Sequence, residues 1–394
     1  MILRKLTYCE FDGRPTQWSL EGLSLGKINL LVGKNATGKT NTITKINWLA
    51  SMLAGLQPQL LNSASYETEF SDETDTYNYT LKLEKNCVVL EKLSINGEEK
   101  FIRDNQGTGH IVAAQFPEQP MNFKLSPNQL VIVSKRDAIQ HPYLEKLSEW
   151  AGGQRMYAFS SKLGQDTVFS TNDMNNFVVN PRDMNSVVPL YVKGEHEFPN
   201  DFRKKVIAAM KNIGYDLTNI GVISNPAISP ASVKSMTHIA DSSSFLMLYV
   251  GEKDIQTPVF QQGMSQGMFR ALSLVIQVIY NVLKKVSTTV LIDDIGEGLD
   301  YERSTNTIQS LMDLAQNNDI QLIMSTNDRF VMNNIPLDYW QVIQRKGGNC
   351  NIYNYENSKK KFDEFKFTGL SNFDFLKTDF LNAEWNDEES SNIR

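Results

Sequence analysis

The feature that most constrains the fold is the run Gly-Lys-Asn-Ala-Thr-Gly-Lys-Thr at residues 33–40, which matches G-x-x-x-x-G-K-[ST] at every fixed position. An apolar segment, residues 27–32, precedes this run. In residues 40–56, which follow, apolar residues recur at the three- and four-residue spacing of an amphipathic helix. A buried strand, a glycine-rich turn and a helix in this order direct backbone N–H groups at phosphate oxygens. The sequence therefore predicts a phosphate loop at residues 33–40.

Each fixed position of the phosphate loop has a chemical role. Gly33 and Gly38 let the backbone curl around an anion, Lys39 reaches the β- and γ-phosphate oxygens, and the Thr40 hydroxyl completes a Mg²⁺ shell. The positive end of the following helix points at the same anion. The nucleotide-binding residues are therefore expected to be Gly33, Lys34, Asn35, Ala36, Thr37, Gly38, Lys39, Thr40 and Asn41.

A pair of acids lies far downstream, where four apolar or β-branched residues, 289–292, are followed by Asp293 and Asp294. An acid in this context lies at the carboxyl edge of a parallel sheet, where such folds bind their ligands. We predict that Asp293 and Thr40 hold Mg²⁺, and that Asp294 orients or deprotonates an attacking water. Two alternatives stay open: the acid pair simply opens a loop, or Glu297 in the next Gly-rich turn is the catalytic carboxylate.

Length and composition limit what surrounds these motifs. At ~150 residues per domain, 394 residues correspond to two domains or to one large core with an insertion. The net charge of −6 offers no global attraction for nucleic acid. Three scattered cysteines suit a reducing cytosol, and the longest apolar stretch, residues 272–283, is shorter than the ~20 residues that cross a bilayer. We therefore expect a cytoplasmic protein without a membrane segment.

Hydrophobic periodicity predicts both strands and helices along the chain, which indicates an α/β fold. Alternation between residues 66 and 116, with a turn at Asn96-Gly97, predicts an antiparallel β-lobe beside that core. Further strands are expected at residues 18–23, 130–134, 245–250, 289–292 and 320–325, and helices at 143–150, 201–213, 266–284 and 301–316. No heptad pattern persists, so a long coiled-coil arm is not expected.

These elements divide the chain into four parts. Residues 1–140 are expected to form the N-terminal part of the core with the β-lobe, and residues 141–244 an inserted, mainly helical lobe. Residues 245–380 would complete the core, and residues 381–394 form an acidic tail. The aromatic-rich segment 353–380 is expected to pack in a core or lid, with a partner-docking surface as the alternative.

Together the motifs resemble those of the ABC-class ATPases, in particular the compact RecF-like and SMC-like heads. Within that class the chain resembles the standalone ATPases of bacterial anti-phage and abortive-infection operons. The phosphate loop resembles Walker A, and residues 290–300 resemble Walker B running into the D-loop, with Asp300 as the D-loop acid. Residues 263–272, 28 residues before the acid pair when counted from Ser265 to Asp293, resemble the signature motif; its central residues are Ser265, Gln266 and Gly267.

The resemblance implies a P-loop ABC-ATPase head that binds ATP and Mg²⁺, with a mostly parallel core sheet and helices on both of its faces. In this class the signature helix of one subunit completes the phosphate loop of another, which implies a homodimer or higher homo-oligomer with ATP sandwiched between the copies. Residues 324–330 resemble the switch loop, where Asn327 replaces the usual histidine. Asp294 replaces the usual glutamate and Gln266 a glycine, so slow hydrolysis is implied. The Q-loop has no firm position: Gln115 competes with the region after residues 130–134.

Three roles are compatible with such an ATPase. The first is the sensor or regulatory ATPase of an anti-phage system, which controls a separately encoded toxin or nuclease. The second is a DNA-repair ATPase whose dimer clamps DNA through basic residues such as Lys204-Lys205, Lys284-Lys285 and Lys359-Lys360-Lys361. The third, a transporter-associated ATPase, fits poorly with an acidic chain that has a large inserted sheet. His196 lies between two acids, but a solvated loop is the expected explanation.

Overall fold

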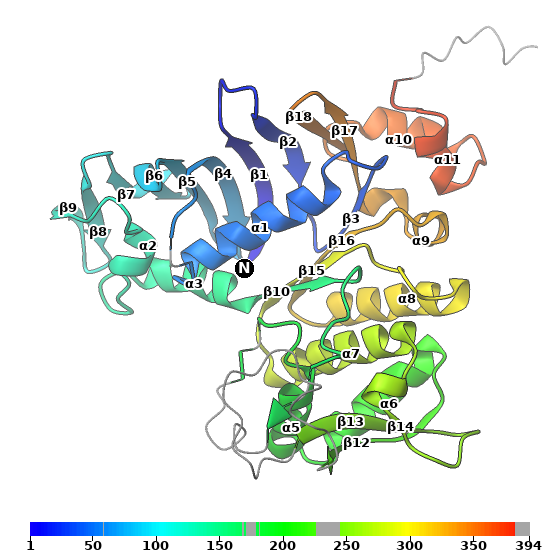
Figure 1. The fold of residues 1–394 in the computed structure, drawn as a ribbon. Helices are drawn as coiled ribbons and strands as arrows, with labels where there is room; N and C mark the ends of the chain where they lie inside the picture. Colours follow the sequence, from blue (N-terminus) through cyan, green and yellow to red (C-terminus); the bar gives the residue numbers. More distant parts are fainter. Residues whose placement is uncertain (58, 168, 171–178, 181, 226–244, 383–394) are drawn as a thin grey trace, which may run out of the picture.

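The structure, a computed structural model, describes residues 1–394 apart from 58, 168, 171–178, 181, 226–244 and 383–394. In this described part, fourteen strands form one continuous sheet in the order β10-β15-β16-β3-β17-β18-β2-β1-β4-β5-β6-β7-β8-β9. A second, smaller sheet lies in a lobe beside it (Figure 1). The predicted acidic tail, residues 381–394, falls almost entirely outside the described residues.

Five neighbouring strands of the large sheet run parallel. They are β10 (Gln154–Ala158), β15 (Thr288–Asp293), β16 (Ile320–Ser325), β3 (Ile28–Val32) and β17 (Trp340–Lys346). Every residue of β3, β15 and β16 is buried, as expected for strands that are covered on both faces. Because these strands share one direction, the loops that follow them meet at a single edge of the sheet.

The sheet continues through mainly antiparallel strands. These are β18 (Asn349–Asn354), β2 (Trp18–Ser24), β1 (Ile2–Glu10), β4 (Ser63–Ser71), β5 (Thr76–Glu84), β6 (Cys87–Ile95), β7 (Glu98–Arg103), β8 (Thr108–Ala113) and β9 (Phe116–Lys124). Five of the thirteen neighbour pairs in the sheet are parallel and eight are antiparallel. The prediction of a mostly parallel sheet is therefore wrong for the sheet as a whole. The period of a strand indicates which residues are buried, but it does not indicate the neighbour with which the strand pairs.

Helices cover both faces of the parallel strands, as predicted. On one face lie α1 (Lys39–Leu53) and α3 (Pro142–Gly153), and on the other α7 (Gln266–Lys284) and α8 (Tyr301–Asn317). Alternate residues of β3 divide between the two faces: Leu31 packs in the same apolar cluster as Ile46 of α1, whereas Leu30 and Val32 pack in the cluster that holds Ile308 of α8. The strand is therefore anchored on both sides just before the phosphate loop begins.

In the residues that the structure describes, the lobe combines a small sheet with two helices. Its elements are β11 (Phe169–Ser170), α5 (Val187–Glu197), α6 (Asp201–Ile213), β12 (Leu217–Asn225), β13 (Phe245–Glu252) and β14 (Val259–Phe260). One side of α7 packs into this lobe, because Phe269 and Ile276 share an apolar cluster with Val206 of α6. The predicted boundary at residue 141 cuts through the core, since α3 packs on α1 and β10 pairs with β15.

Helix α7 is an internal helix of the protein. Among the described residues it is the one helix long and apolar enough, by length and composition, to cross a membrane. It has 19 residues, and 83% of its most apolar 18-residue stretch is buried inside the protein. Its apolar character therefore serves the contact between the main sheet and the lobe (Figure 1).

Residues 130–134, predicted to be a strand, form a short helix instead. In α2 (Val131–Ser134) the backbone N–H groups of Val131 and Ile132 donate to the carboxylate of Glu91, at 2.7 and 3.2 Å. A buried acid thus satisfies donors that a helix start leaves unpaired. A short apolar run does not distinguish a strand from a buried turn of helix, which explains the error.

The last part of the described chain closes the core at the edge of the parallel strands. It consists of the β17–β18 hairpin, which the sequence did not predict, and of α9 (Arg329–Asn334), α10 (Lys359–Lys366) and α11 (Asn372–Lys377). The aromatic-rich segment packs as a core there, as predicted. Four of its phenylalanines are buried in the cluster that also covers β3: Phe362, Phe365, Phe375 and Phe380.

Candidate nucleotide-binding site

The predicted phosphate loop and the predicted acid pair meet in the structure. The Thr40 hydroxyl donates a hydrogen bond of 3.1 Å to Oδ1 of Asp293. The Ser325 hydroxyl, at the end of β16, donates to the same oxygen at 2.6 Å. The loops after β3, β15 and β16 therefore converge on one carboxylate, as expected for the carboxyl edge of parallel strands.

The backbone of the phosphate loop takes conformations that its sequence allows. Gly38 precedes α1 with φ of 111°, and Ala36 has φ of 61°, so both lie in the left-handed region. A Cβ on Gly33 would lie 2.7 Å from the carbonyl oxygen of Ile343, so only glycine fits there. Lys34, Asn35, Ala36 and Thr40 are exposed, and Asn41 is exposed on the first turn of α1. The loop is therefore backed by β17 and open to solvent on its outer side.

Carbonyl groups of the phosphate loop itself hold the Lys39 side chain in place. Its side chain is buried, and its Nζ donates to the carbonyl oxygens of Gly33 at 3.0 Å and Lys34 at 3.1 Å. Burial lowers the pKa of the Lys39 ammonium, while the carboxylates of Asp294 and Asp293 oppose that shift. The ammonium is therefore a cation beside two acids, with neutral carbonyl partners that an anionic ligand could replace.

Three residues that the motifs did not indicate support the loop from behind. The Arg345 Nη1 donates to the carbonyl oxygen of Ala36 at 3.1 Å, and the Cys350 thiol donates to that of Thr37 at 3.2 Å. A Cβ on Gly38 would lie 3.2 Å from both Cys350 and the Trp18 ring. These supports come from the β17–β18 hairpin and from β2, so they could be recognised only after the sheet order was known.

Ser325 organises both acids and was also missed. Its hydroxyl donates to Asp293 and accepts the backbone N–H of Asp294 at 3.0 Å. Asp294 is half-buried in a left-handed conformation, with φ of 55°. Burial raises the pKa of the Asp294 carboxyl, and the nearby Asp293 and Glu297 raise it further, whereas Lys39 opposes them. The proton affinity of the Asp294 carboxylate is therefore increased.

The three predicted catalytic side chains line one cavity of ≈ 330 Å³, whose wall contains Asp294, Ile295, Glu297, Thr326, Asn327 and Asp328. The switch loop is tied to the turn after β15, because the Thr326 hydroxyl donates to the carbonyl oxygen of Ile295 at 3.1 Å. Asp328 caps α9 by accepting the N–H groups of Phe330 and Val331. The exposed Asn327 is therefore fixed at both ends of its loop beside the acids.

The signature motif lies against a different part of the chain. Ser265 caps α7 by accepting the backbone N–H of Met268 at 3.2 Å, and both Ser265 and Gln266 are exposed. Gly267 is buried against the D-loop, where a Cβ would lie 2.5 Å from the carbonyl oxygen of Gly298. Asp300 caps α8 and pairs with Arg303 at 2.9 Å. The signature motif thus packs on the D-loop of the same chain, whereas the phosphate loop contacts the β17–β18 hairpin.

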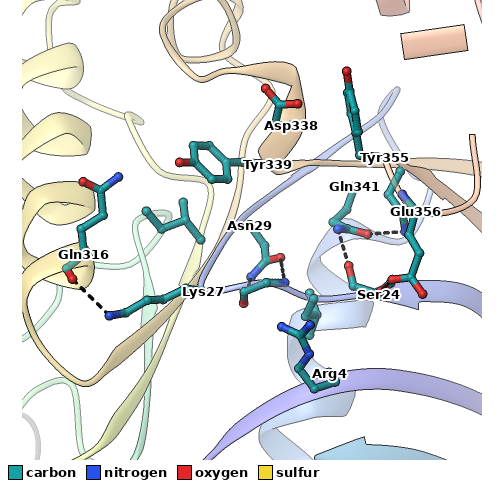
Figure 2. A pocket seen from close by; sticks show the side chains of 14 residues that line it. Arg4, Ser24, Lys27, Asn29, Gln316, Asp338, Tyr339, Gln341, Tyr355 and Glu356 are labelled. Atoms are coloured by element: carbon teal, nitrogen blue, oxygen red, sulfur yellow. Dashed lines mark hydrogen bonds between the residues drawn. The ribbon is translucent and has the colours of Figure 1, made fainter. Parts of the chain in front are cut away.

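A second cavity of ≈ 330 Å³ lies at the opposite edge of the parallel strands (Figure 2). It opens where β3 begins, and its lining includes Arg4, Lys27 and Tyr339. Lys27 donates to the carbonyl oxygen of Gln316 at 3.2 Å, and Figure 2 shows it directed toward that residue. Since the phosphate loop follows the other end of β3, this cavity is separate from the predicted site.

Metal-ligand clusters are not found in the described part of the chain, where no group of three or more His, Cys, Asp or Glu side chains is placed to hold an ion. The acids on either side of His196 have other partners: Glu195 pairs with Arg203, and Glu197 with Lys284 at 3.2 Å. His196 itself is exposed at the end of α5. His196 is therefore solvated, as predicted, but it lies in a helix and not in the predicted loop.

Comparison with known proteins bears on the fold. No protein-family model matches the chain, and no curated protein matches it. Among solved structures, an SMC head bound to the C-winged helix domain of ScpA matches with a TM-score of 0.53 and 11% identity, over 90% of this chain and 97% of that one. The chain has the fold of an SMC head domain. Because this is an ABC-class ATPase fold, the resemblance based on the motifs is confirmed at the level of the fold.

Two further SMC heads also match. The head from Thermotoga maritima has a TM-score of 0.43 and 14% identity, over 90% of this chain and 99% of that one. A head from Pyrococcus furiosus, bound to the C-terminal domain of ScpA, has a TM-score of 0.46 and 9% identity, over 93% and 100%.

Within this SMC-head fold, Gln115, one of the two Q-loop candidates that the sequence left open, does not lie at the site. Gln115 lies at the turn between β8 and β9, at the far end of the sheet from β3 (Figure 1). The loop after β10 lies at the site instead, because the N–H of Phe159 donates to the carbonyl oxygen of Asp293 at 3.0 Å. The sequence did not reveal β10, because its residues directly continue α3 and include a buried Gln154 and Arg155.

Proposed function

We propose that the protein binds ATP with Mg²⁺ and hydrolyses it slowly. The observation that carries this proposal is the convergence of Lys39, the Thr40–Asp293 pair and the cavity lined by Asp294 at one sheet edge. The donor set fits Mg²⁺, since a hydroxyl and a carboxylate oxygen are hard ligands of the kind this ion prefers. Thr40 and Asp293 would hold the ion, which would neutralise charge on the phosphate oxygens.

The roles of the remaining residues follow from where they lie. The phosphate loop and Lys39 would bind and orient the triphosphate, and Asp294 would accept a proton from the attacking water. Its raised pKa suits a base better than an ordinary carboxyl would. Asn327 lines the same cavity and would orient that water by hydrogen bonding. Glu297, also in the wall, is the alternative base. Slow turnover is proposed because Asp294 is shorter than glutamate and Asn327 carries no titratable proton.

We further propose that two copies, or a higher homo-oligomer, enclose ATP between them. Ser265 and Gln266 are exposed at the positive end of a 19-residue helix, which suits them to a phosphate from outside the chain. The same end is backed by the D-loop through Gly267. Binding of the γ-phosphate would hold the copies together, and its loss would release them, which makes the dimer a nucleotide-driven switch.

For the biological role, we propose the regulatory ATPase of an anti-phage system that controls a separate effector. The resemblance of the motifs favours it, and the described residues contain no metal cluster that would serve a second reaction. Docking of another protein has a precedent in this fold, because the SMC head with a TM-score of 0.53 binds a winged helix domain of ScpA. An effector of this protein would have to be identified by co-purification in the presence of ATP.

The SMC-head fold favours a second candidate, an ATPase that clamps DNA. Two of the basic groups that such a clamp would use have acidic partners, since Lys284 pairs with Glu197 and Lys360 with Glu364. Lys204 and Lys205 are exposed on α6. DNA binding by the ATP-bound dimer that weakens steeply with salt would support the clamp. If the ATP-bound dimer does not bind DNA at low salt, the clamp is excluded and the regulatory role remains as the proposal.

The decisive test of the ATPase proposal is titration with ATP and Mg²⁺ of the protein and of two lysine variants. Lys39→Ala is expected to abolish nucleotide binding, because it removes the buried ammonium that lies beside the acid pair. Lys27→Ala removes an exposed lysine at the opposite end of β3 and is the matched control, with unchanged binding expected. Equal ATP affinity in all three proteins would contradict the proposed site.

A further inference from the structure

The described part of the chain contains a buried arginine that has no acidic partner in the structure. Arg270, in the second turn of α7, is 4% exposed. Its Nη1 donates to the carbonyl oxygen of Glu297 at 2.8 Å, and its Nε donates to that of Ser161 at 3.1 Å. Burying a guanidinium without a carboxylate costs free energy, which is only partly offset by hydrogen bonds to neutral carbonyls.

The surroundings are shaped to admit this guanidinium. Gly298 has φ of 79°, and a Cβ there would lie 2.5 Å from the Nη1 of Arg270. The carbonyl oxygen of Gly298 in turn faces Gly267, where a Cβ would lie 2.5 Å away. Two glycines thus bring the start of α7, the arginine and the turn after β15 into direct contact. A larger residue at Gly267 would have to move the turn, and one at Gly298 would have to displace the Arg270 guanidinium.

The two carbonyls belong to the segments that flank the acid pair. Glu297 closes the turn that begins at Asp294, because its N–H donates to the carbonyl oxygen of Asp294 at 3.2 Å. Ser161 follows β10, and the N–H of Phe159 in the same loop donates to the carbonyl oxygen of Asp293. Arg270 therefore joins both flanks of the acids to a helix whose first residues carry the signature motif.

We propose that Arg270 is a positioning residue: it fixes the turn from Asp294 to Gly298 against the signature helix of the same chain. Gly296 and Gly298, with φ of 95° and 79°, give that turn wide conformational freedom. Without the arginine, the turn would sample other conformations, and Asp294 would lose its alignment with the attacking water. This inference rests on the proposed ATPase activity and specifies which group sets the geometry of the acids.

The first test compares steady-state kinetics of Arg270→Gln, Arg270→Lys and the unchanged protein. For Arg270→Gln, we expect kcat to fall about 10- to 100-fold with KM for ATP nearly unchanged, because only the alignment of the acid turn is lost. Arg270→Lys keeps one donor and should recover part of the rate. Arg203→Gln, which removes a surface ion pair in the lobe, is the control and should leave kcat unchanged. An unchanged kcat in a folded Arg270→Gln protein would overturn the inference.

The second test separates positioning of the acids from support of the signature helix. Mixed dimers are assembled in which one chain carries Lys39→Ala, so that only the other chain's phosphate loop holds ATP. Placing Arg270→Gln in the chain with the intact phosphate loop should slow hydrolysis, and placing it in the Lys39→Ala chain should not. The reverse result, or equal loss in both arrangements, would overturn the inference. If the unchanged protein itself neither dimerises nor hydrolyses ATP, the proposed function fails instead.

Discussion

Thr40 donates a hydrogen bond to Asp293 across 253 residues of sequence, at a distance of 3.1 Å. The first of these residues follows β3 and the second ends β15, and β16 lies between the two strands. Ser325 at the end of β16 completes the contact by donating to the same carboxylate oxygen. The last residues of β15 and β16 thus meet the first turn of α1 at one point.

Replacing Asp294 by Asn should separate binding from turnover. The amide keeps the shape of the side chain but cannot accept a proton, so we expect ATP affinity to be preserved and hydrolysis to fall about 100-fold. The ATP-bound dimer should then accumulate, which native mass spectrometry would detect. Glu297→Gln is the paired variant: if it slows hydrolysis and Asp294→Asn does not, the base is Glu297.

The rate of hydrolysis should depend on pH through Asp294. A base must be deprotonated to act, and burial together with Asp293 and Glu297 raises the pKa of this carboxyl. The rate is therefore expected to fall on acidification around a midpoint above the ordinary carboxyl pKa of about 4. Measuring kcat across acidic pH in the unchanged protein and in Asp294→Asn checks this, because the variant should lose that limb of the profile. An identical acidic limb in both would assign it to another group.

Ser265→Ala should impair assembly rather than nucleotide binding to the single chain. The variant loses the side chain that caps α7, at a cost of about 1 kcal/mol, together with the hydroxyl proposed to reach the partner's γ-phosphate. We expect normal ATP binding at low protein concentration and loss of the ATP-dependent dimer in size-exclusion chromatography. Ser371→Ala removes the comparable cap of α11, remote from the signature, and serves as the control. A dimer that forms equally in both variants would contradict the proposed contact.

Glu91 should make the stability of the antiparallel strands depend on pH. Its carboxyl is fully buried, and burial raises its pKa from 4.5 to about 7 although three donors oppose the shift. Between these values the folded state keeps the proton that the unfolded chain releases, so stability should fall as the pH rises from 4.5 to 7 and then level off. The loss amounts to about 3 kcal/mol. Thermal unfolding at several pH values should show this slope, and Glu91→Gln should remove it; an unchanged slope would exclude Glu91 as its source.

The sequence was informative where a motif and a strand coincide. The strands before Gly33 and Asp293 were recognisable as short buried runs, and the shared edge follows because parallel strands end on the same side. That reasoning was sufficient to place Lys39, Thr40 and the acid pair in one site. It also located Ser265 at a helix start, since serine is a frequent cap there.

The sequence could not show which distant segments of the chain lie side by side in the fold. Arg345 and Cys350 support the phosphate loop from more than 300 residues away, and their hairpin has too short an apolar run to stand out. Gln115 follows a strand, as expected, but that strand lies at the wrong end of the sheet. Arg270 shows the same limit, because its partners are backbone carbonyls that no pattern of side chains encodes.

The continuity of the large sheet has a mechanical consequence. Strand β9 at one end and β3 near the other are joined by an unbroken series of hydrogen-bonded neighbours through β1, β2 and the β17–β18 hairpin. Moving the outer strands relative to Gly33 therefore requires the whole sheet to twist or bend. A force applied at β9 would reach the phosphate loop as a change in the curvature of the sheet beneath it.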